Sequence, residues 1–218
     1  MTISGIRLVL TACTVLAVLT VIVVVHPGPL PGEVEYIRWL QHRGEPLASI
    51  ADFVRHTTST LANLIVLALP AALAAKRYGR PARQAVVIAL AAMLAVQPMY
   101  KEVVDRPRPD ETQVEVRAEH SSKSFPSGHS LGTATVWGAA AGLAWTRRRR
   151  GLAVVLGVPI GATGVSSGVQ GVHWPSDAVA GTIVGGVTAW AMVVLISSAG
   201  APGPFHRAAD PPTGTVAG

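Results

Sequence analysis

Residues 125–130 read FPSGHS and lead directly into an apolar stretch over 129–145 that we expect to be a helix. Ser127 and Gly128 stand where this helix would begin. The first backbone N–H groups of a helix have no partner within it. Together with the positive end of the helix dipole, these N–H groups bind anions. The segment therefore predicts an anion site at the start of a helix.

Apolar runs recur along the chain on both sides of this segment. Hydrophobic residues make up 50% of the 218 residues and charged residues 14%, whereas soluble domains carry about 25% charged residues. About 20 apolar residues suffice for a helix to cross a bilayer. We therefore predict an all-α protein, a six-transmembrane-helix bundle with an outward-facing active site. The expected spans are 8–25, 58–75, 84–100, 129–145, 152–170 and 177–198.

Basic residues lie in short clusters between these runs, at Arg7, within 76–83 and at 147–150. Such clusters mark cytoplasmic loops, so the first, third and fifth loops would face outward. The net charge of +6 then reflects membrane orientation and does not indicate a nucleic acid partner. We expect a multi-pass protein of the plasma membrane with an extracytoplasmic site. Residues 1–198 would form the membrane domain and 199–218 a disordered cytoplasmic tail rich in Pro, Gly and Ala.

Small residues recur four positions apart within the expected spans. This spacing lets helix backbones approach closely in lipid, so we expect close helix contacts at several of these positions. The pairs are Gly138 and Gly142, Gly157 and Gly161, Gly164 and Gly168, and Gly181 and Gly185. Pro98 and Pro159 lie within spans and are expected to kink them.

The first outward loop contains a further helical pattern, because Val34, Ile37 and Leu40 recur at helical spacing. Such a segment can lie along the membrane interface. It would either form a rim that guides lipid to the site or simply pack on the bundle.

Three polar segments interrupt the apolar chain, and all three fall in outward loops or at their edges. They are KEVVDRPRP at 101–109, FPSGHS at 125–130 and VHWPSD at 172–177. Polar and ionisable groups are costly at a membrane and tend to be functional there. We therefore expect the three segments to converge on one site.

The residue types in these segments suit phosphate chemistry. Lys101 and Arg108 are cations that can bind phosphate oxygens. His129, in the first turn of its helix, could donate a proton to a leaving oxygen. His173 is followed four residues later by Asp177, and a carboxylate beside a histidine sets its tautomer. One histidine could then act as nucleophile and the other as general acid.

These segments resemble the signature of the type 2 phosphatidic acid phosphatase superfamily, which also includes bacterial acid phosphatases and vanadium haloperoxidases. The signature consists of K-x6-R-P, P-S-G-H and S-R-x5-H-x3-D. The matching residues are Lys101, Arg108 and Pro109 for the first motif, Pro126, Ser127, Gly128 and His129 for the second, and Ser166, His173 and Asp177 for the third.

The resemblance implies hydrolysis through a phosphohistidine. His173 would attack phosphorus, Asp177 would orient His173, and His129 would protonate the leaving alcohol. The phosphate would be held by Lys101, Arg108, Ser127 and Gly128. The resemblance implies no metal and no other cofactor, and the sequence shows no dense set of metal-ligating residues.

The expected substrate is a lipid phosphate or a polyprenyl (pyro)phosphate, and the other expected partners are membrane lipids. Phosphatidic acid, phosphatidylglycerol phosphate and undecaprenyl pyrophosphate would present the same phosphate head to these residues, so the sequence does not choose between them. It also carries no indication of oligomeric state.

The chain departs from the third motif at Ser167, where the family has arginine. Three interpretations follow. Another cation could substitute, for which Arg106, Arg117 and Lys123 are candidates in the same outward loop. The Ser167 hydroxyl could give one neutral hydrogen bond and leave a slower enzyme. The protein could instead have lost catalysis and bind lipid phosphates only.

Two rival functions fit the sequence less well. A transporter would place polar groups near the bilayer midplane, whereas these segments lie at one membrane edge. A haloperoxidase would share the pocket, but those members of the family are typically soluble.

Overall fold

The computed structural model describes residues 3–59, 61–66, 76, 79–118 and 122–199. The described residues contain helices, turns and loops but no strand, which confirms the all-α prediction. The helices are α1 (Ile3–Val25), α2 (Glu33–Gln41), α3 (Glu45–Thr57), α5 (Arg80–Ala91), a π-helical segment (Ala92–Val96), α6 (Gln97–Val104), α7 (Gly128–Thr146), α8 (Arg150–Val169) and α9 (Pro175–Ala199). Residues 61–66 are also helical.

Four helical stretches within the described residues are long and apolar enough to cross a membrane. They are Gly5–Val25, Arg80–Val104, Arg150–Val169 and Pro175–Ser198, and they correspond to four of the six expected spans. The chain is therefore an integral membrane protein. Most of the span expected over 58–75 lies outside the described residues, as does the tail expected over 199–218 except for residue 199, which ends α9.

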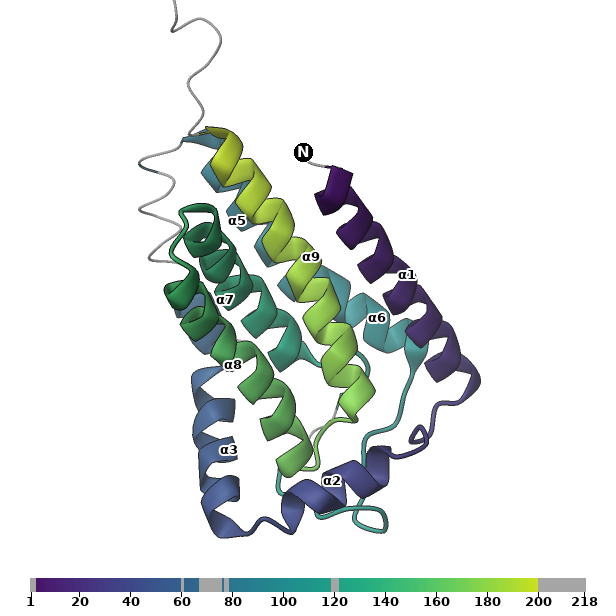
Figure 1. Cartoon of the computed structure of the whole chain (residues 1–218). Coiled ribbons are helices and arrows are strands. Elements are labelled where there is room, and N and C mark those ends of the chain that lie inside the picture. Colours follow the sequence, from purple (N-terminus) through teal and green to yellow (C-terminus); the bar gives the residue numbers. More distant parts are fainter. Residues whose placement is uncertain (1–2, 60, 67–75, 77–78, 119–121, 200–218) are drawn as a thin grey trace, which may run out of the picture.

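The helix expected over 129–145 forms as α7 (Gly128–Thr146), but it is not among the helices apolar enough to cross a membrane. Its polar residues face other helices, and Ser130, Thr133 and Thr135 are buried. It packs between α8 and α9 (Figure 1). A helix that is enclosed by protein does not need the uniformly apolar surface of one that faces lipid.

The third expected span is one continuous helix from Arg80 to Val104 that contains the π-helical segment Ala92–Val96. Pro98 follows directly in the first turn of α6. Proline has no N–H to donate to the carbonyl four residues earlier. A π-helical turn absorbs such a break in the hydrogen-bond ladder, and the span continues to Lys101.

The glycines of α9 bring its backbone against α7. A methyl group at Gly181 would lie 2.3 Å from the Ser127 carbonyl oxygen, and one at Gly185 would lie 2.4 Å from the Leu131 carbonyl oxygen. The expected close contact is therefore confirmed for this pair. It is not met at Gly157 and Gly161, because among the described residues a methyl group at either would meet nothing within 4 Å.

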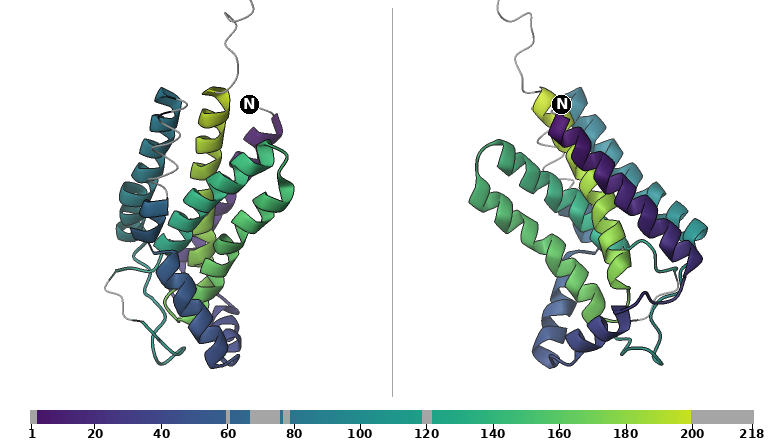
Figure 2. Two further views of the ribbon diagram at one scale, coloured as in Figure 1. Left: turned by 90° about the vertical axis from the view of Figure 1, so that its left-hand side faces the viewer. Right: turned by 45° about the vertical axis from the view of Figure 1, so that its right-hand side comes forward.

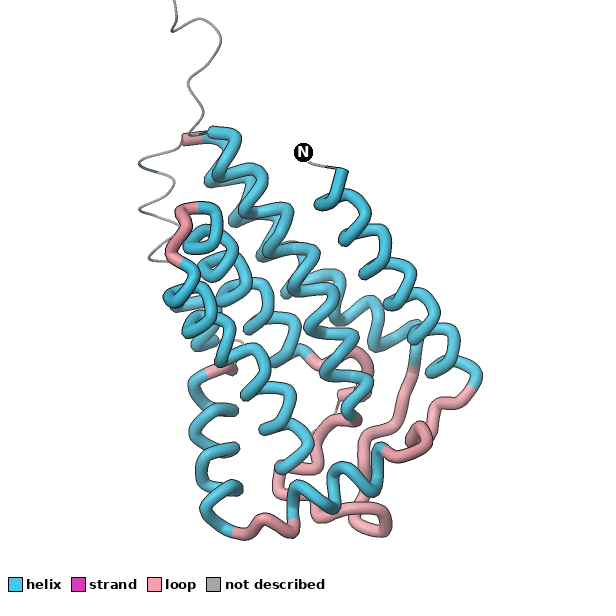
Figure 3. Tube along the Cα trace, in the orientation of Figure 1, coloured by secondary structure: helices cyan, strands magenta, loops and turns pink. Residues whose placement is uncertain are grey.

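The three polar segments and the helices α2 and α3 lie at one end of the bundle. α2 lies across this end, and the loops that follow α6 and α8 lie beside it (Figures 1 and 3). Ile37 of α2 packs on Val114 and Trp174, whereas Leu40 packs on Ala51 and Val169. The helical pattern expected in the first outward loop is thus confirmed. We call this end of the bundle the α2 end.

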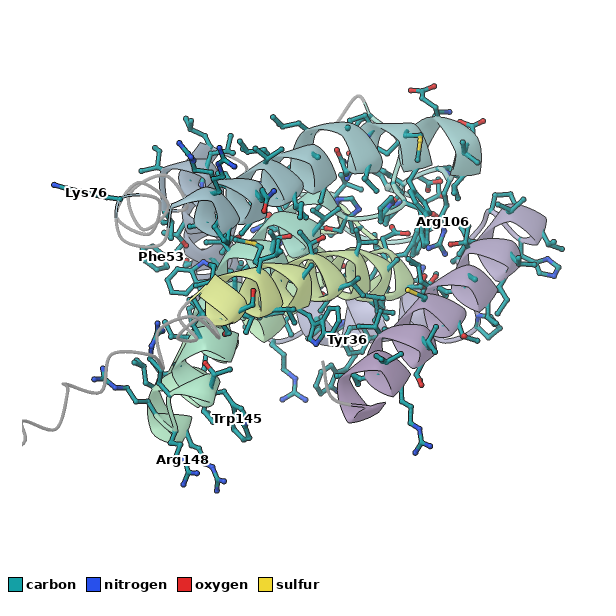
Figure 4. All side chains as sticks on the ribbon, turned by 90° about the horizontal axis from the view of Figure 1, so that it is seen from above. Tyr36, Phe53, Lys76, Arg106, Trp145 and Arg148 are labelled. Atoms are coloured by element: carbon teal, nitrogen blue, oxygen red, sulfur yellow. The ribbon has the colours of Figure 1, made fainter. Side chains whose placement is uncertain are left out.

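The opposite end carries the chain ends and basic residues. α1 begins there, α9 ends there, and α7 and α8 are joined there in an antiparallel hairpin (Figures 1 and 2). Residues 147–150, four consecutive arginines, form that joint and are exposed. Lys76 and Arg148 point away from the bundle, whereas Arg106 lies within it (Figure 4).

Candidate active site

The start of α7 is tied to the first turn of α9. Ser127 is the N-cap residue of α7, and its Oγ accepts a hydrogen bond from the Ser130 N–H at 3.4 Å. The Ser127 N–H donates to the Asp177 carbonyl oxygen at 3.0 Å. Next to it, a methyl group at Gly128 would lie 3.0 Å from Nε2 of Gln97. The second and third motifs therefore lie side by side, as expected.

The two cations of the first motif converge on Ser122. Lys101 Nζ donates to Ser122 Oγ at 2.8 Å, and Arg108 Nε donates to the Ser122 carbonyl oxygen at 2.7 Å. Arg108 also donates from its NH1 to the Val172 carbonyl oxygen at 2.5 Å. Burial lowers the pKa of Arg108 to about 10, against the opposing effect of the Asp177 charge. Arg108 is still a cation at neutral pH.

Arg108 also contacts His173, because its NH1 lies 3.2 Å from His173 Nε2. A guanidinium can only donate hydrogen bonds, so Nε2 is the nitrogen that holds the lone pair. The proton then belongs on Nδ1, which lies 3.5 Å from Oδ2 of Asp177 and 3.4 Å from Oγ of Ser124. In this tautomer, the nucleophilic nitrogen Nε2 lies beside Arg108.

His173 is almost fully buried, with 3% of its surface exposed. Burial lowers the pKa of His173 to about 4, assisted by the charges of Arg108 and Lys101 and opposed by Asp177. The imidazole is therefore neutral near pH 7, and its Nε2 lone pair is not blocked by a proton.

The carboxylate of Asp177 is held from several sides and has no exposed surface. Its Oδ2 accepts from the Trp174 N–H at 2.9 Å and from the Ser124 hydroxyl. Its Oδ1 accepts from NH1 of Arg106 at 2.6 Å. These bonds hold the carboxylate beside His173, and charge-assisted bonds of this kind are the stronger ones.

Arg106 links Asp177 to the outer helix α2. Its NH2 donates to Oε2 of Glu33 at 2.7 Å and to the Gly28 carbonyl oxygen at 3.1 Å. Its NH1 also donates to Ser176 Oγ at 2.7 Å, and Glu33 Oε1 accepts from the Ser176 N–H at 2.9 Å. Arg106 is fully buried between two carboxylates, so it is committed to them and is not a spare cation for phosphate.

The other two cations considered as substitutes are also paired. Arg117 lies 3.0 Å from a carboxylate oxygen of Glu115. Lys123 forms an ion pair with Asp105, and half of its side chain is exposed. Neither residue contacts His173 or Asp177 within the part of the chain that the structure describes.

His129 lies in the first turn of α7 and is half-buried. His129 directly follows Gly128 at the start of α7, where Ser127 is bound to Asp177, and the cations Arg108 and Lys101 are near enough to disfavour a charge on its imidazole. Its ring has no hydrogen-bond partner among the described residues. The structure thus brings both histidines to one group of cations.

Ser167 does not face this group as a donor. Its Oγ donates to the Thr163 carbonyl oxygen at 2.9 Å, which is one turn earlier in α8. The hydroxyl proton is therefore used within the helix, which weighs against a neutral hydrogen bond from Ser167 to phosphate.

Two side chains at this site, Glu33 and Ser124, were not expected from the sequence. Glu33 forms a buried pair with Arg106 behind Asp177, and Ser124 contacts both Asp177 and His173. Ser124 lies two residues before the second motif, and its position there is the only sequence signal for it. Within the described residues, no group of three or more His, Cys, Asp and Glu side chains could hold a metal ion.

Comparisons with known proteins identify a family and a similar fold. The family model of the PAP2 superfamily matches residues 80–200. The fold is similar to a crystal structure from Bacillus subtilis, described as the first transmembrane PAP2 type phosphatidylglycerolphosphate phosphatase. The TM-score is 0.71 and the identity 19%, over 87% of this chain and 94% of the other.

No curated protein sequence matches the chain significantly. The matched segment nevertheless contains all three motifs and more than half of the residues, which confirms the resemblance found in the sequence. The chain belongs to the PAP2 superfamily.

Proposed function

We propose that this protein is an integral membrane phosphatase that hydrolyses a lipid phosphate or a polyprenyl (pyro)phosphate through a phosphohistidine. The contact between Arg108 NH1 and His173 Nε2, at 3.2 Å, is the observation that supports this most directly. It places a neutral nitrogen that carries a lone pair beside a half-buried cation. A phosphoryl group bound by that cation would present its phosphorus to the nitrogen.

The first half-reaction transfers the phosphoryl group to His173. The lone pair on Nε2 forms a bond to phosphorus while the bond from phosphorus to the leaving oxygen breaks. His129 carries a proton once the bound phosphate anion offsets the surrounding cations. It gives this proton to that oxygen, so the lipid leaves as a neutral alcohol, or as a lipid monophosphate when the substrate is a pyrophosphate. Asp177 stabilises the positive charge that develops on the ring of His173.

The second half-reaction returns the enzyme to its starting state. His129, now neutral, takes a proton from a water molecule as its oxygen attacks phosphorus. The bond from phosphorus to Nε2 breaks, and inorganic phosphate leaves. Lys101, Arg108, the Gly128 N–H and the Ser127 hydroxyl would bind the phosphoryl oxygens, whose charge is greatest in the transition state. The Ser127 N–H is already bound to the Asp177 carbonyl oxygen.

A groove between α8 and α9 supports a lipid as the substrate. It has a volume of about 580 Å³ and is mostly apolar, with Gly161, Gly164, Val179 and Ile183 among its lining residues. Its end at Glu33 and Pro175 lies next to the site segment 172–177. A hydrocarbon chain in this groove would leave its phosphate near His173.

We further propose that the α2 end faces the extracytoplasmic side of the plasma membrane. Four consecutive arginines, 147–150, lie at the opposite end. Basic residues of this kind are retained on the cytoplasmic side.

The test is phosphate release by purified protein in detergent from a panel of lipid phosphates and polyprenyl pyrophosphates. Release from at least one member, abolished by His173→Ala, is the expected result. Absence of release from every member, with folded wild-type protein, would contradict the phosphatase. That outcome would favour the second candidate, a lipid-phosphate-binding protein, which the replacement of the motif arginine by Ser167 makes the main competitor.

A further inference from the structure

Arg55, in the last turn of α3, has a guanidinium that is not fully hydrogen-bonded by the described residues. Its NH1 is buried and has no hydrogen-bond partner within the described part of the chain. A guanidinium carries five N–H donors and no acceptor. Leaving a buried charged donor unpaired is costly, so this position calls for an acceptor beyond those that the described residues supply.

α3 is held against the part of α8 that lacks the motif arginine. Ser166 Oγ donates to the Ala51 carbonyl oxygen at 2.7 Å, and Gln170 Nε2 donates to Oδ1 of Asp52 at 3.0 Å. These two bonds flank Ser167 in the sequence. Arg55 comes one turn after Ala51, so it lies on the face of α3 that is turned toward α8.

The chain after α3 is also attached to α7, one turn beyond His129. Asn63 Nδ2 donates to Oγ1 of Thr133 at 3.2 Å, and Thr163 of α8 donates to the same oxygen at 3.4 Å. Along the chain, Arg55 therefore lies between two sets of hydrogen bonds. The first set joins α3 to α8 on either side of Ser167, and the second joins residue 63 to α7 one turn after His129.

The charge of Arg55 reaches the site itself. It acts on the guanidinium of Arg108 and on the imidazole of His129. Arg55, Arg108 and Lys101 therefore act on one region, and Asp177, the carboxylate that acts on Arg108 and Lys101, is already bound to Arg106. Like charges held this close repel one another unless an anion lies among them.

From these contacts we propose that Arg55 is a phosphate-binding residue that supplies, from α3, the guanidinium missing at Ser167. The proposal rests on the site being a phosphate site, as argued above. The small Ser167 side chain, with its hydroxyl turned back to Thr163, leaves this side of the pocket to Arg55. The cation would thus come from a helix that precedes the family-matching residues 80–200.

The first experiment removes and then relocates the cation. Arg55→Ala should lower kcat/KM by about 10²–10³, the scale for one donor to transition-state charge. Arg55→Lys should retain part of the activity, because it keeps the charge but loses the planar fork. The double variant Arg55→Ala/Ser167→Arg should recover at least about tenfold over Arg55→Ala, since it restores the family's arrangement. Ser167→Arg alone should not raise turnover, because Arg55 already serves the pocket.

Arg43→Ala is the matched control. Arg43 lies just before α3 and stacks over Trp39 at 4.3 Å, away from the site. It should change kcat/KM less than about twofold. All variants would be compared by thermal melting, so that Arg55→Lys and the double variant decide the question if Arg55→Ala does not fold.

Binding of inorganic phosphate, measured by calorimetry on the same variants, separates this proposal from the phosphatase itself. Weaker phosphate binding in folded Arg55→Ala, with a wild type that hydrolyses nothing, would support Arg55 while refuting the enzyme. Unchanged phosphate binding and unchanged turnover in folded Arg55→Ala would overturn the role of Arg55. A folded double variant as impaired as Arg55→Ala would also overturn it.

Discussion

The two sides of α9 differ sharply. On one side Gly181 and Gly185 let the α9 backbone touch α7, with no space even for a methyl group. On the other side α9 faces α8 across an apolar groove, which Gly161 and Gly164 help to line. Glycine thus allows close contact between α9 and α7, and it also leaves the groove between α9 and α8 unfilled. The closed side, toward α7, holds the two motif segments in place, whereas we propose that the open side, toward α8, admits the lipid chain.

The largest effect should come from the chemistry that the closed side positions. His173→Ala removes the proposed nucleophile and should lower kcat at least about 10⁴-fold, as for nucleophiles of other covalent enzymes. Phosphate release from the best substrate of the panel measures this. Residual turnover within tenfold of the wild type would mean that another group attacks phosphorus.

Next comes the buried pair that joins α2 to Asp177. Glu33→Ala would remove one of the two carboxylates that pair with the fully buried Arg106 and leave only Asp177, and breaking such buried pairs costs about 3–5 kcal/mol. We expect a clear fall in melting temperature together with loss of activity. Glu35→Ala is the control, since Glu35 is an exposed residue of the same helix. Equal melting temperatures for the two variants would contradict this role of Glu33.

The closed interface can be tested with two adjacent glycines of α9. A methyl group at Gly185 would overlap the Leu131 carbonyl oxygen at 2.4 Å, whereas one at Gly186 would meet nothing within 4 Å. Gly185→Ala should therefore destabilise the protein by about 1–3 kcal/mol, and Gly186→Ala should not. Thermal melting in detergent compares them, and the same small change in both would refute the close contact.

The open side predicts an effect that depends on the substrate. Gly161→Leu would fill part of the groove and should lower kcat/KM for long-chain lipid phosphates by about tenfold, the scale of one to two buried methylene groups. Hydrolysis of p-nitrophenyl phosphate, which has no chain, should not change. Gly157→Leu is the control, since a methyl group at Gly157 would also meet none of the described residues within 4 Å, but Gly157 does not line the groove. An equal loss of kcat/KM for both substrates would argue against lipid binding in the groove.

The smallest expected effect is on the protonation of His173 between pH 5 and pH 7. Because burial lowers the pKa of His173 to about 4, its imidazole should stay neutral across this range and take up a proton only as the pH falls toward 4. A histidine at its ordinary pKa of about 6.5 would instead be roughly 97% protonated at pH 5. NMR of ¹⁵N-labelled histidine, assigned with His173→Ala, measures the midpoint. A midpoint near 6.5 would contradict the dry, cation-lined environment of His173.

Sequence reasoning performed best where the chemistry is local. The start of α7 at Ser127 and Gly128 and the spacing of His173 and Asp177 within a turn follow from neighbouring residues. It predicted α7 as a helix but not how the helix packs, since Ser130, Thr133 and Thr135 are buried against its neighbours. The close contact that it predicted is not met at Gly157 and Gly161 among the described residues, because a glycine pair has the same spacing whether or not another helix lies opposite.

The substitute cation shows the same limit. Arg106, Arg117 and Lys123 were considered because they share a loop with the first two motifs, yet each is paired with a carboxylate. Arg55 was not considered, since it belongs to another segment and carries no motif. Its unpaired NH1 becomes visible only when α3 is placed against α8.

The sequence by itself determined that the chain is helical, embedded in a membrane and a bearer of the three PAP2 motifs. An apolar run in lipid must satisfy its backbone hydrogen bonds internally, which leaves the helix as the solution for a single segment. Only the tertiary structure decided which charges meet. Arg106 and Glu33 are 73 residues apart, and such a contact depends on how whole helices pack, which no local pattern of residues encodes.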